Sequence, residues 1–338
     1  MAICEEHQRM SVSPMAWLAL AVIVTGLLMV DFIGHARKPH PPSMREATGW
    51  TIGYICLAVV YGLAVWGSDG RTYAGQFYAG WLTEWSLSVD NLFVFILILS
   101  AFRVPRDFQQ KALLLGIATA LVLRLVFILT GAALIRHFSW VFYLFGAFLV
   151  YTAVKQLLDA RKDDDTEEDA TAYVDNSVTR LVRRLLPTTD GFVGNKLIHR
   201  HAGRTMITPL LIVVIALGTA DLMFAFDSIP AIFGLTSEPF LVFSATAFSL
   251  LGLRQLFFLI DGLLSHLVYL PYGLTVILGF IGLKLVNHAL HENTLPFING
   301  GEPVTALPEP STEVSLGLIV ITLALVAVTS LIHARRRA

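Results

Sequence analysis

Long runs of hydrophobic residues, separated by short polar segments, occupy most of the 338-residue chain. Nine runs are long enough to cross the hydrocarbon core of a bilayer, which takes ~20 apolar residues in a helix. They cover residues 14–33, 50–67, 78–101, 111–135, 138–158, 207–235, 240–264, 268–290 and 314–333. The pattern predicts an all-α polytopic membrane protein with about nine transmembrane helices, in which residues 1–335 form a single transmembrane domain.

The composition agrees with this pattern and narrows the function classes. Hydrophobic residues make up 55% of the chain and charged residues only 14%, against about 25% charged in soluble proteins. The formal net charge of −1 gives no broad basic surface for nucleic acid. The sequence has no H-E-x-x-H, no G-x-S-x-G and no phosphate-binding glycine loop, so we expect neither an enzyme nor a tightly bound cofactor.

Lysine and arginine are unevenly distributed between the two sets of loops, which predicts the orientation in the membrane. Most of the Lys and Arg residues lie in the loops after the first, third and fifth runs and in the C-terminal tail. Because cytoplasmic loops are enriched in Lys and Arg, we expect a bacterial inner-membrane protein with its N-terminus outside and its C-terminus in the cytoplasm. The first run is read as a retained helix, since Glu5 and Glu6 stand where a signal peptide would be basic.

Residues 159–206 form the only sizeable polar segment between the predicted helices. The segment opens with DARKDDDTEEDA, an acidic run that we expect to be solvated and mobile. Residues 178–186 repeat Val and Leu at helical spacing with arginines between them, which is typical of a basic amphipathic helix on the inner leaflet. The stretch KLIHRHAGRTMIT, with Ala202-Gly203 near its middle, predicts a small hairpin.

Two matched pairs of acidic residues stand inside apolar runs. Asp90 and Asp227 each lie within a predicted span, and each has an acidic residue six positions earlier, Glu84 and Asp221 respectively. A carboxylate at membrane depth costs about 2.5–3.5 kcal/mol on insertion scales. Such residues mark ion or proton paths in membrane proteins, so these four are the first candidates for a functional site.

Ionisable residues also recur at a nearly fixed spacing, which predicts an internal repeat. The matched positions are Glu84 and Asp221, Asp90 and Asp227 (both 137 apart), Arg124 and Arg254 (130), His137 and His266 (129), and Lys155 and Lys284 (129). Each repeat holds three spans, residues 78–158 and 207–290, so the second enters the membrane from the opposite side. An inverted repeat of this kind places a substrate site near the membrane midplane, where the repeats meet. The spans 14–33, 50–67 and 314–333 would be peripheral.

The candidate site offers oxygen ligands only. Asp90-Asn91 in the first repeat matches Asp227-Ser228 in the second, with Glu84 and Asp221 behind them. Carboxylate, amide and hydroxyl oxygens suit hard cations such as Mn²⁺, Mg²⁺ or Ca²⁺. We therefore predict that a divalent cation is the substrate of this site.

The six-residue spacing has a geometric consequence for the helices. Six residues turn a helix by roughly 240°, so Glu84 and Asp90 do not share a face of a regular helix. Both can line one path if the helix is broken. Pro230 predicts such a break in the second repeat, because it removes the N–H that would bond the carbonyl of Phe226.

A buried ion pair is the alternative role for the acidic residues. The candidate partners are Arg124, Arg254, Lys155 and Lys284, and the two roles can coexist. We expect the guanidinium groups to be structural clamps and the lysines to extend toward the membrane surface. Asp31 ends the first span, where local capping is expected. His288 and His291 form an H-x-x-H that fits either a wet interfacial pair or a metal site.

The two acidic motifs resemble those of the TerC family of integral membrane proteins. They are Glu84-Trp-Ser-Leu-Ser-Val-Asp90-Asn91-Leu-Phe-Val-Phe95 and Phe224-Ala-Phe-Asp227-Ser228-Ile229-Pro230-Ala231. The resemblance implies a three-plus-three helix plan and efflux of Mn²⁺, with the two motifs as the transport site. Many members carry an acidic residue where this chain has Gly218 ahead of Asp221, which changes the charge of the implied site.

The sequence therefore leaves two alternative hypotheses for the function. The first is a secondary transporter that exports a divalent cation, with Mn²⁺ as the first candidate and protons as the candidate counter-ion, because metal binding displaces protons from carboxylates. The second is a membrane scaffold or stress-response component for tellurite resistance, which would act with soluble partners through the 159–206 loop.

Overall fold

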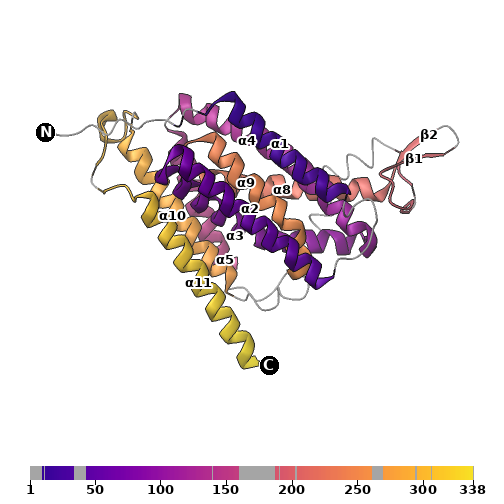
Figure 1. Cartoon of the computed structure of the whole chain (residues 1–338). Coiled ribbons are helices and arrows are strands. Elements are labelled where there is room, and N and C mark those ends of the chain that lie inside the picture. Colours follow the sequence, from indigo (N-terminus) through magenta and orange to yellow (C-terminus); the bar gives the residue numbers. More distant parts are fainter. Residues whose placement is uncertain are drawn as a thin grey trace.

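The computed structural model describes residues 10, 12–33, 43–138, 140–159, 187–189, 191–201, 204–260, 269–293, 295–305 and 307–337. Its elements are shown in Figure 1. They are α1 (Pro14–Asp31), α2 (Met44–Asp69), α3 (Arg71–Ala101), α4 (Arg106–His137), α5 (Val141–Asp159), β1 (Ile198–His201), β2 (Arg204–Ile207), α8 (Pro209–Phe233), α9 (Pro239–Ile260), α10 (Leu270–His291), the 3-10 turn η3 (Asn299–Gly301) and α11 (Thr312–Arg337).

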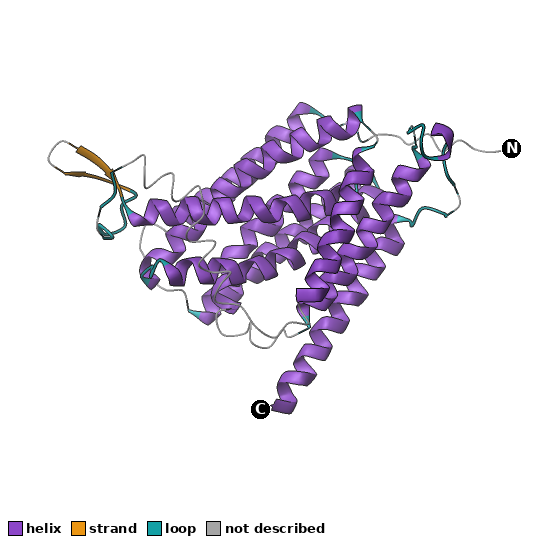
Figure 2. Cartoon of the chain, turned by 180° about the vertical axis from the view of Figure 1, so that it is seen from behind, coloured by secondary structure: helices purple, strands orange, loops and turns teal. Residues whose placement is uncertain are grey.

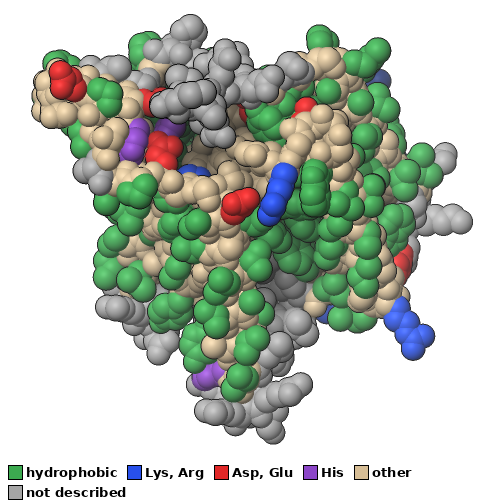
Figure 3. All heavy atoms as spheres, turned by 60° about the vertical axis from the view of Figure 1, so that its left-hand side comes forward, with side chains coloured by type: hydrophobic (Ala, Val, Ile, Leu, Met, Phe, Trp, Pro, Cys, Tyr) green, Lys and Arg blue, Asp and Glu red, His purple; other side chains and the backbone are tan. Residues whose placement is uncertain are grey.

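The all-α membrane fold is confirmed. Within the described residues, eight helices are long and apolar enough to cross a membrane. They contain or overlap eight of the nine predicted spans, and the remaining span, 78–101, lies inside the 31-residue helix α3. Hydrophobic side chains are spread widely over the face shown in Figure 3, and they outnumber the charged and histidine side chains on it. The protein is an integral, multi-pass membrane protein.

Local sequence signals set the helix boundaries. Ser13 and Ser43 begin α1 and α2, and each side-chain oxygen accepts a hydrogen bond from a backbone N–H three residues later, at 3.2 Å. A single residue, Gly70, separates α2 from α3 and has a φ of 97°. Because side-chain-bearing residues rarely adopt this conformation, glycine is what permits so tight a turn between two long helices.

The core of the bundle is built from α3, α8 and α9. The apolar stretch of α9 is entirely buried, while α1 and α11 expose most of theirs. α3 packs on both α8 and α9, α4 packs on α8 and α9, and α5 lies along α10. α1 lies against α9, where Trp17 contacts Phe240 edge-on with ring centroids 5.3 Å apart. This arrangement brings the acid-bearing helices α3 and α8 together in the interior.

A pair of glycines permits the close approach of α5 and α10. A Cβ added at Gly146 would lie 2.8 Å from the carbonyl oxygen of Gly282 and 2.6 Å from Cγ2 of Val286. A Cβ at Gly282 would in turn lie 3.0 Å from the carbonyl oxygen of Gly146 and 2.9 Å from Cγ2 of Val150. The contact is reciprocal, and only hydrogen fits at its centre. Small residues at such crossings allow helix backbones to pack closely in membranes.

The hairpin predicted near Ala202-Gly203 is confirmed. β1 and β2 pair in antiparallel register, with Ile198 opposite Ile207 and His201 opposite Arg204. In Figure 2 the hairpin extends from one end of the helical body. Most of the predicted acidic run and the predicted amphipathic helix 178–186 lie outside the described residues.

We expect Gly146→Leu to destabilise the protein, because the new side chain meets the backbone of α10 and the two helices must separate. Overpacking of this kind costs about 1–3 kcal/mol, enough to lower the melting temperature by several degrees. The measurement is thermal unfolding in detergent. Gly53→Leu on α2 is the matched control, since a Cβ there has nothing within 4 Å. Equal melting temperatures for the two variants would contradict the close approach.

Candidate functional site

An arginine from α4 joins acidic side chains from two other helices in the centre of the bundle. Nε of Arg124 donates to Oδ2 of Asp221 at 2.7 Å, and Nη2 donates to Oδ1 of the same carboxylate at 3.0 Å. Nη1 donates to Oε1 of Glu84 on α3 and to Oγ of Ser228 at 3.3 Å. The guanidinium thus holds α3, α4 and α8 together through three of the predicted site residues.

This cluster is isolated from solvent and lipid. Arg124 and Glu84 are 0% exposed, and Asp221 and Ser228 are 1% exposed. The planar guanidinium binds Asp221 in the two-pronged geometry that favours arginine over lysine. One oxygen, Oε2 of Glu84, has no partner within the described part of the chain. Arg124 is therefore a clamp between α3, α4 and α8, as expected for a buried guanidinium, and it occupies the space between the two carboxylates.

Asp227 belongs to a different environment. It lies six residues after Asp221 on α8, is only partly buried, and accepts a hydrogen bond from Oγ1 of Thr152 on α5 at 3.4 Å. Lys155 lies one turn further along α5, near enough to act on Asp227 electrostatically. Because six residues turn the helix by roughly 240°, α8 presents Asp221 to α4 and Asp227 to α5. The structure thus separates the two acids instead of joining them in one site.

Helix α3 places Glu84 on a buried face. On α3, Glu84, Ser88 and Asn91 have the spacing of one helix face, and all three are buried. Asp90 lies in α3, but its side chain is outside the described part of the structure. Of the six predicted site residues, Glu84, Asp221 and Ser228 meet around Arg124, and Asp227 stands apart from them.

The helix break predicted at Pro230 is wrong. α8 runs without interruption from Pro209 to Phe233 and includes Pro230. The proline stands close to the end of the helix, where the N–H of Gly234 already bonds to the carbonyl of Pro230 at 3.0 Å. Losing one N–H so near the end leaves the earlier turns of the helix intact. No break is needed, because Asp221 and Asp227 serve different faces.

Arg254 is a second buried guanidinium, and its partner comes from outside the predicted repeats. Its Nη2 donates to Oδ1 of Asp31 at 2.7 Å. Asp31 is the last residue of α1 and is 1% exposed, and it forms an interhelical ion pair that its position in the sequence does not indicate. Nε and Nη1 of Arg254 have no partner among the described residues.

The two predicted lysines are not ion-paired in the described structure. Lys155 is exposed, as expected for a lysine that extends toward the membrane surface. Nζ of Lys284 on α10 donates to Oγ of Ser315 at 3.1 Å, which links α10 to α11.

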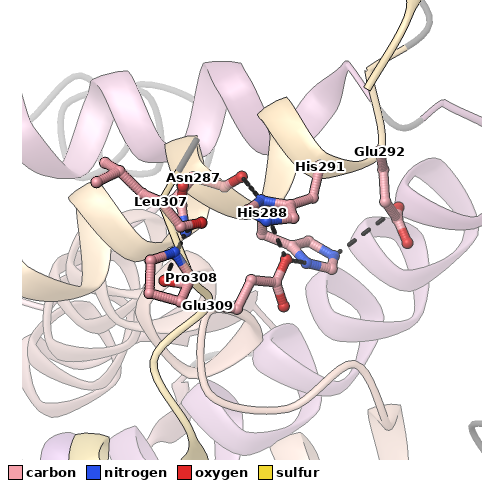
Figure 4. A network of polar contacts seen from close by, with 7 residues as sticks. All are labelled: Asn287, His288, His291, Glu292, Leu307, Pro308 and Glu309. Atoms are coloured by element: carbon pink, nitrogen blue, oxygen red, sulfur yellow. Dashed lines mark hydrogen bonds and ion pairs between the residues drawn. The ribbon is translucent and has the colours of Figure 1, made fainter. Parts of the chain in front are cut away.

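The H-x-x-H at the end of α10 fastens a loop, as Figure 4 shows. Nδ1 of His288 lies 2.9 Å from Oε1 of Glu309, and Nδ1 of His291 donates to the carbonyl of Asn287 at 2.9 Å. Glu292 lies 3.8 Å from Nε2 of His288. These contacts are of the kind expected for an interfacial pair.

Sequence reasoning missed Thr152, Asp31 and Glu309 as partners of the charged residues. Thr152 stands three residues before Lys155 in an apolar run. This spacing places both on one side of a helix and could have indicated a polar face on α5. The other two contacts join segments far apart in the sequence, and no local pattern indicates them.

Comparison with known proteins places these features in context. The profile of the Integral membrane protein TerC family matches residues 69–338. The chain is 49% identical over 329 residues to Uncharacterized membrane protein Rv2723 of Mycobacterium tuberculosis, covering 97% of this chain and 82% of the relative.

Two further relatives come from other bacteria. Uncharacterized membrane protein STKORF319 of Myxococcus xanthus is 41% identical over 273 residues, covering 81% of this chain and 83% of the relative. The Escherichia coli protein named "Putative membrane-bound redox modulator Alx" is 37% identical over 283 residues, covering 81% and 86%. No solved structure matches the chain.

Neutralising the two acids of α8 should have different effects on stability. Asp221→Asn leaves the buried Arg124 without its two-pronged partner, and breaking a buried pair in this way costs about 3–5 kcal/mol. Asp227→Asn removes one long hydrogen bond from a partly exposed carboxylate and should change the melting temperature little. Thermal unfolding of both variants in detergent measures the difference, and similar losses would contradict the separate roles.

The loop contact at Glu309 can be tested by proteolysis. We expect Glu309→Gln to weaken the bond to His288 and to increase cleavage of the 295–311 segment under limited proteolysis, because that contact ties the segment to α10. Glu302→Gln, in the same segment with an exposed side chain, is the control. Unchanged cleavage of Glu309→Gln would show that other contacts hold the loop.

Proposed function

Because the chain belongs to the TerC family of integral membrane proteins, we propose that it is a secondary transporter exporting a divalent cation, with Mn²⁺ as the first candidate. The cation is the substrate and not a resident cofactor, and the protein is not an enzyme. The observation that carries the proposal is the cluster of Glu84, Asp221 and Arg124, with Asp227 partly exposed on the same helix as Asp221. Buried charge inside a membrane bundle is costly and marks functional sites.

The chemistry of the available ligands supports a hard cation. Asp227 offers a carboxylate that has one long hydrogen bond, and Thr152 offers a hydroxyl beside it. Asn91 and Ser228 add an amide and a hydroxyl, and Asp90 adds the matching carboxylate of the first repeat. These are the oxygen donors that Mn²⁺, Mg²⁺ and Ca²⁺ prefer. Asp90 and Asp227 are therefore the proposed entry ligands.

Glu84 and Asp221 have a second role in this proposal. Arg124 pairs with both carboxylates while no cation is bound, so neither of them is left without a positively charged partner in the interior. A divalent cation approaching from Asp227 would compete with the guanidinium for the same oxygens. Arg124 thus favours divalent over monovalent cations at these oxygens. A cation with more than one charge interacts more strongly with the carboxylates than the guanidinium it replaces.

Helix packing supports the inverted repeat. A Cβ at Gly116 on α4 would lie 3.0 Å from Cβ of Leu217 on α8, and one at Gly80 on α3 would lie 3.4 Å from Cβ of Ala245 on α9. Gly80 and Leu217 are 137 residues apart, and Gly116 and Ala245 are 129 apart. These are the spacings of the acids and close to that of the arginines, so the two crossings are repeat equivalents. An inverted repeat is the usual basis of alternating access in transporters.

The contact between α5 and α10, the third helices of the two predicted repeats, pairs residues at a different spacing from that of the lysines. Gly146 and Gly282 contact each other reciprocally and are 136 residues apart, whereas Lys155 and Lys284 are 129 apart. The packing therefore does not favour the two lysines as equivalent residues. The charge matches that support the repeat are those of α3 with α8 and of α4 with α9.

The proposed setting is the bacterial inner membrane, with the N-terminus outside and protons as the counter-ion. The partners are then the cation and the lipid bilayer, and residues 178–186 would lie on the inner leaflet. The alternative is a stress-response component that works through the 159–206 loop in tellurite resistance. The name of the Escherichia coli relative, which describes redox modulation, favours keeping this alternative.

Flux measurements with purified protein in liposomes test the transport proposal. We expect Mn²⁺ movement driven by a pH gradient, with slower movement of Mg²⁺, Ca²⁺ and Zn²⁺. Asp90→Asn and Asp227→Asn should each reduce Mn²⁺ flux at least tenfold, because a ligand charge is lost. Asp107→Asn, an exposed acid in the first turn of α4, is the matched control and should transport normally.

The alternative function predicts another outcome. Full Mn²⁺ flux in both Asp90→Asn and Asp227→Asn would show that these residues are not the transport ligands. No flux of any cation in the unmodified protein, together with loss of tellurite tolerance on deleting residues 163–172, would favour the scaffold.

A further inference from the structure

The two buried arginines hold equivalent positions in the predicted repeats, but they are satisfied to different degrees. All three nitrogens of Arg124 have partners, supplied by Asp221, Glu84 and Ser228. Arg254 is 1% exposed and donates only through Nη2, to Asp31. Its Nε and Nη1 have no partner within the described residues. A buried guanidinium with two unused donors is costly, and it calls for a physical explanation.

Among the described residues, Glu84 has an acceptor oxygen without a donor, just as Arg254 has donors without an acceptor. Its Oε1 accepts from Arg124, but Oε2 is buried without a partner in the described structure. Asp221, its repeat equivalent, uses both oxygens in the two-pronged bond with Arg124. By the repeat, the counterpart of the Arg124–Asp221 pair is a pair between Arg254 and Glu84. The two ends of that missing pair are the groups that carry unpartnered atoms.

The positions of Glu84 and Arg254 along their helices, counted from the point where α3 and α9 cross, permit a pair between them. Glu84 follows the Gly80–Ala245 crossing by four residues on α3, as Asp221 follows Leu217 by four on α8. Arg254 follows the crossing by nine residues on α9, and the equivalent spacing from Gly116 to Arg124 is eight. At 1.5 Å per residue, the two arrangements differ in level by only about 1.5 Å.

A small cavity is lined by neighbours of the two residues. Trp85 on α3 and Gly252 on α9 both line it, together with Tyr54 on α2. Trp85 is next to Glu84 in the chain, and Gly252 is two residues from Arg254. α3 and α9 also pack extensively on each other. The two residues are therefore carried by helices in direct contact.

We propose that Arg254 is a positioning residue that exchanges Asp31 for Glu84 when the transporter turns to its other side. In the exchanged state, Arg254 and Glu84 form the two-pronged pair that Arg124 and Asp221 form here, and Asp31 is released at the end of α1. The two arginines then alternate as the main clamp on the interior carboxylates. This inference rests on the proposed transport function, because only a protein with two opposite-facing states needs the exchange.

A charge swap separates this role from a purely structural anchor for α1. Asp31→Arg combined with Arg254→Asp restores the pair between α1 and α9 but places a negative charge where Arg254 would meet Glu84. We expect a melting temperature within a few degrees of the unmodified protein and at least a tenfold loss of Mn²⁺ flux in liposomes. Normal flux in the folded double variant would overturn the proposal.

The control swap is Arg71→Glu with Glu313→Arg. This pair also joins two helices, α3 and α11, at 3.7 Å, but both side chains are largely exposed. We expect the control to keep both its melting temperature and its flux. Loss of flux here as well would mean that charge swaps damage the protein in general, and the transport result would then count against a specific role for Arg254.

A second measurement needs no transport and covers a swap that fails to fold. The shift in melting temperature caused by Glu84→Gln is compared in the unmodified protein and in Asp31→Asn. Without the Asp31 charge, Arg254 turns to Glu84, so we expect Glu84→Gln to lower the melting temperature by several degrees more in Asp31→Asn. Equal shifts would overturn the exchange. If the unmodified protein moves no cation, the transport proposal fails, while this comparison still reports on the pair.

Discussion

The packing of this protein depends on neutralising charge where neither water nor lipid can do so. Arg124 carries a permanent positive charge into the centre of the bundle, and Glu84 and Asp221 must meet it there. Because the guanidinium is planar and its donors are fixed, the three helices that carry these groups have little freedom in rotation or register. The hydrophobic contacts of α3, α4 and α8 are compatible with many arrangements, but the ion cluster is compatible with few.

The same requirement explains why the two predicted repeats differ in detail. Two arginines enter the interior, but both interior carboxylates bind the first of them. The second is neutralised by Asp31, so α1, a helix outside the repeats, becomes part of the charge balance. Trp17 holds α1 to α9 through aromatic contacts near its other end. α1 is therefore attached to the core by apolar contacts and by an ion pair.

Much of the fold follows from the sequence, and the reasons are local. Apolar runs near membrane length determine the helices, and charged residues within them are rare enough to reveal matched positions in two halves of the chain. The hairpin at residues 198–207 likewise follows from a local pattern. Sequence also indicated that Arg124 and Arg254 would act as clamps, since a guanidinium at membrane depth has few other roles.

The partners of these groups could not be predicted in the same way. Which acid binds Arg124 depends on rotations of three helices, and periodicity alone allowed Asp227 as readily as Asp221. The ion pair between Asp31 and Arg254 joins residues more than two hundred positions apart. Pro230 predicted a break because proline removes a hydrogen bond, but the cost of that loss depends on how near the helix end lies. Each of these outcomes is set by tertiary packing, which the pattern of a single sequence does not contain.

The glycine contact between α5 and α10 has a mechanical consequence. Because the two backbones meet at Gly146 and Gly282, sliding one helix along the other would drive Val150 and Val286 into the opposing chain. The contact therefore fixes the register of α5 against α10. Since these are the third helices of the two predicted repeats, the close approach also fixes how the two halves of the chain are aligned along this interface.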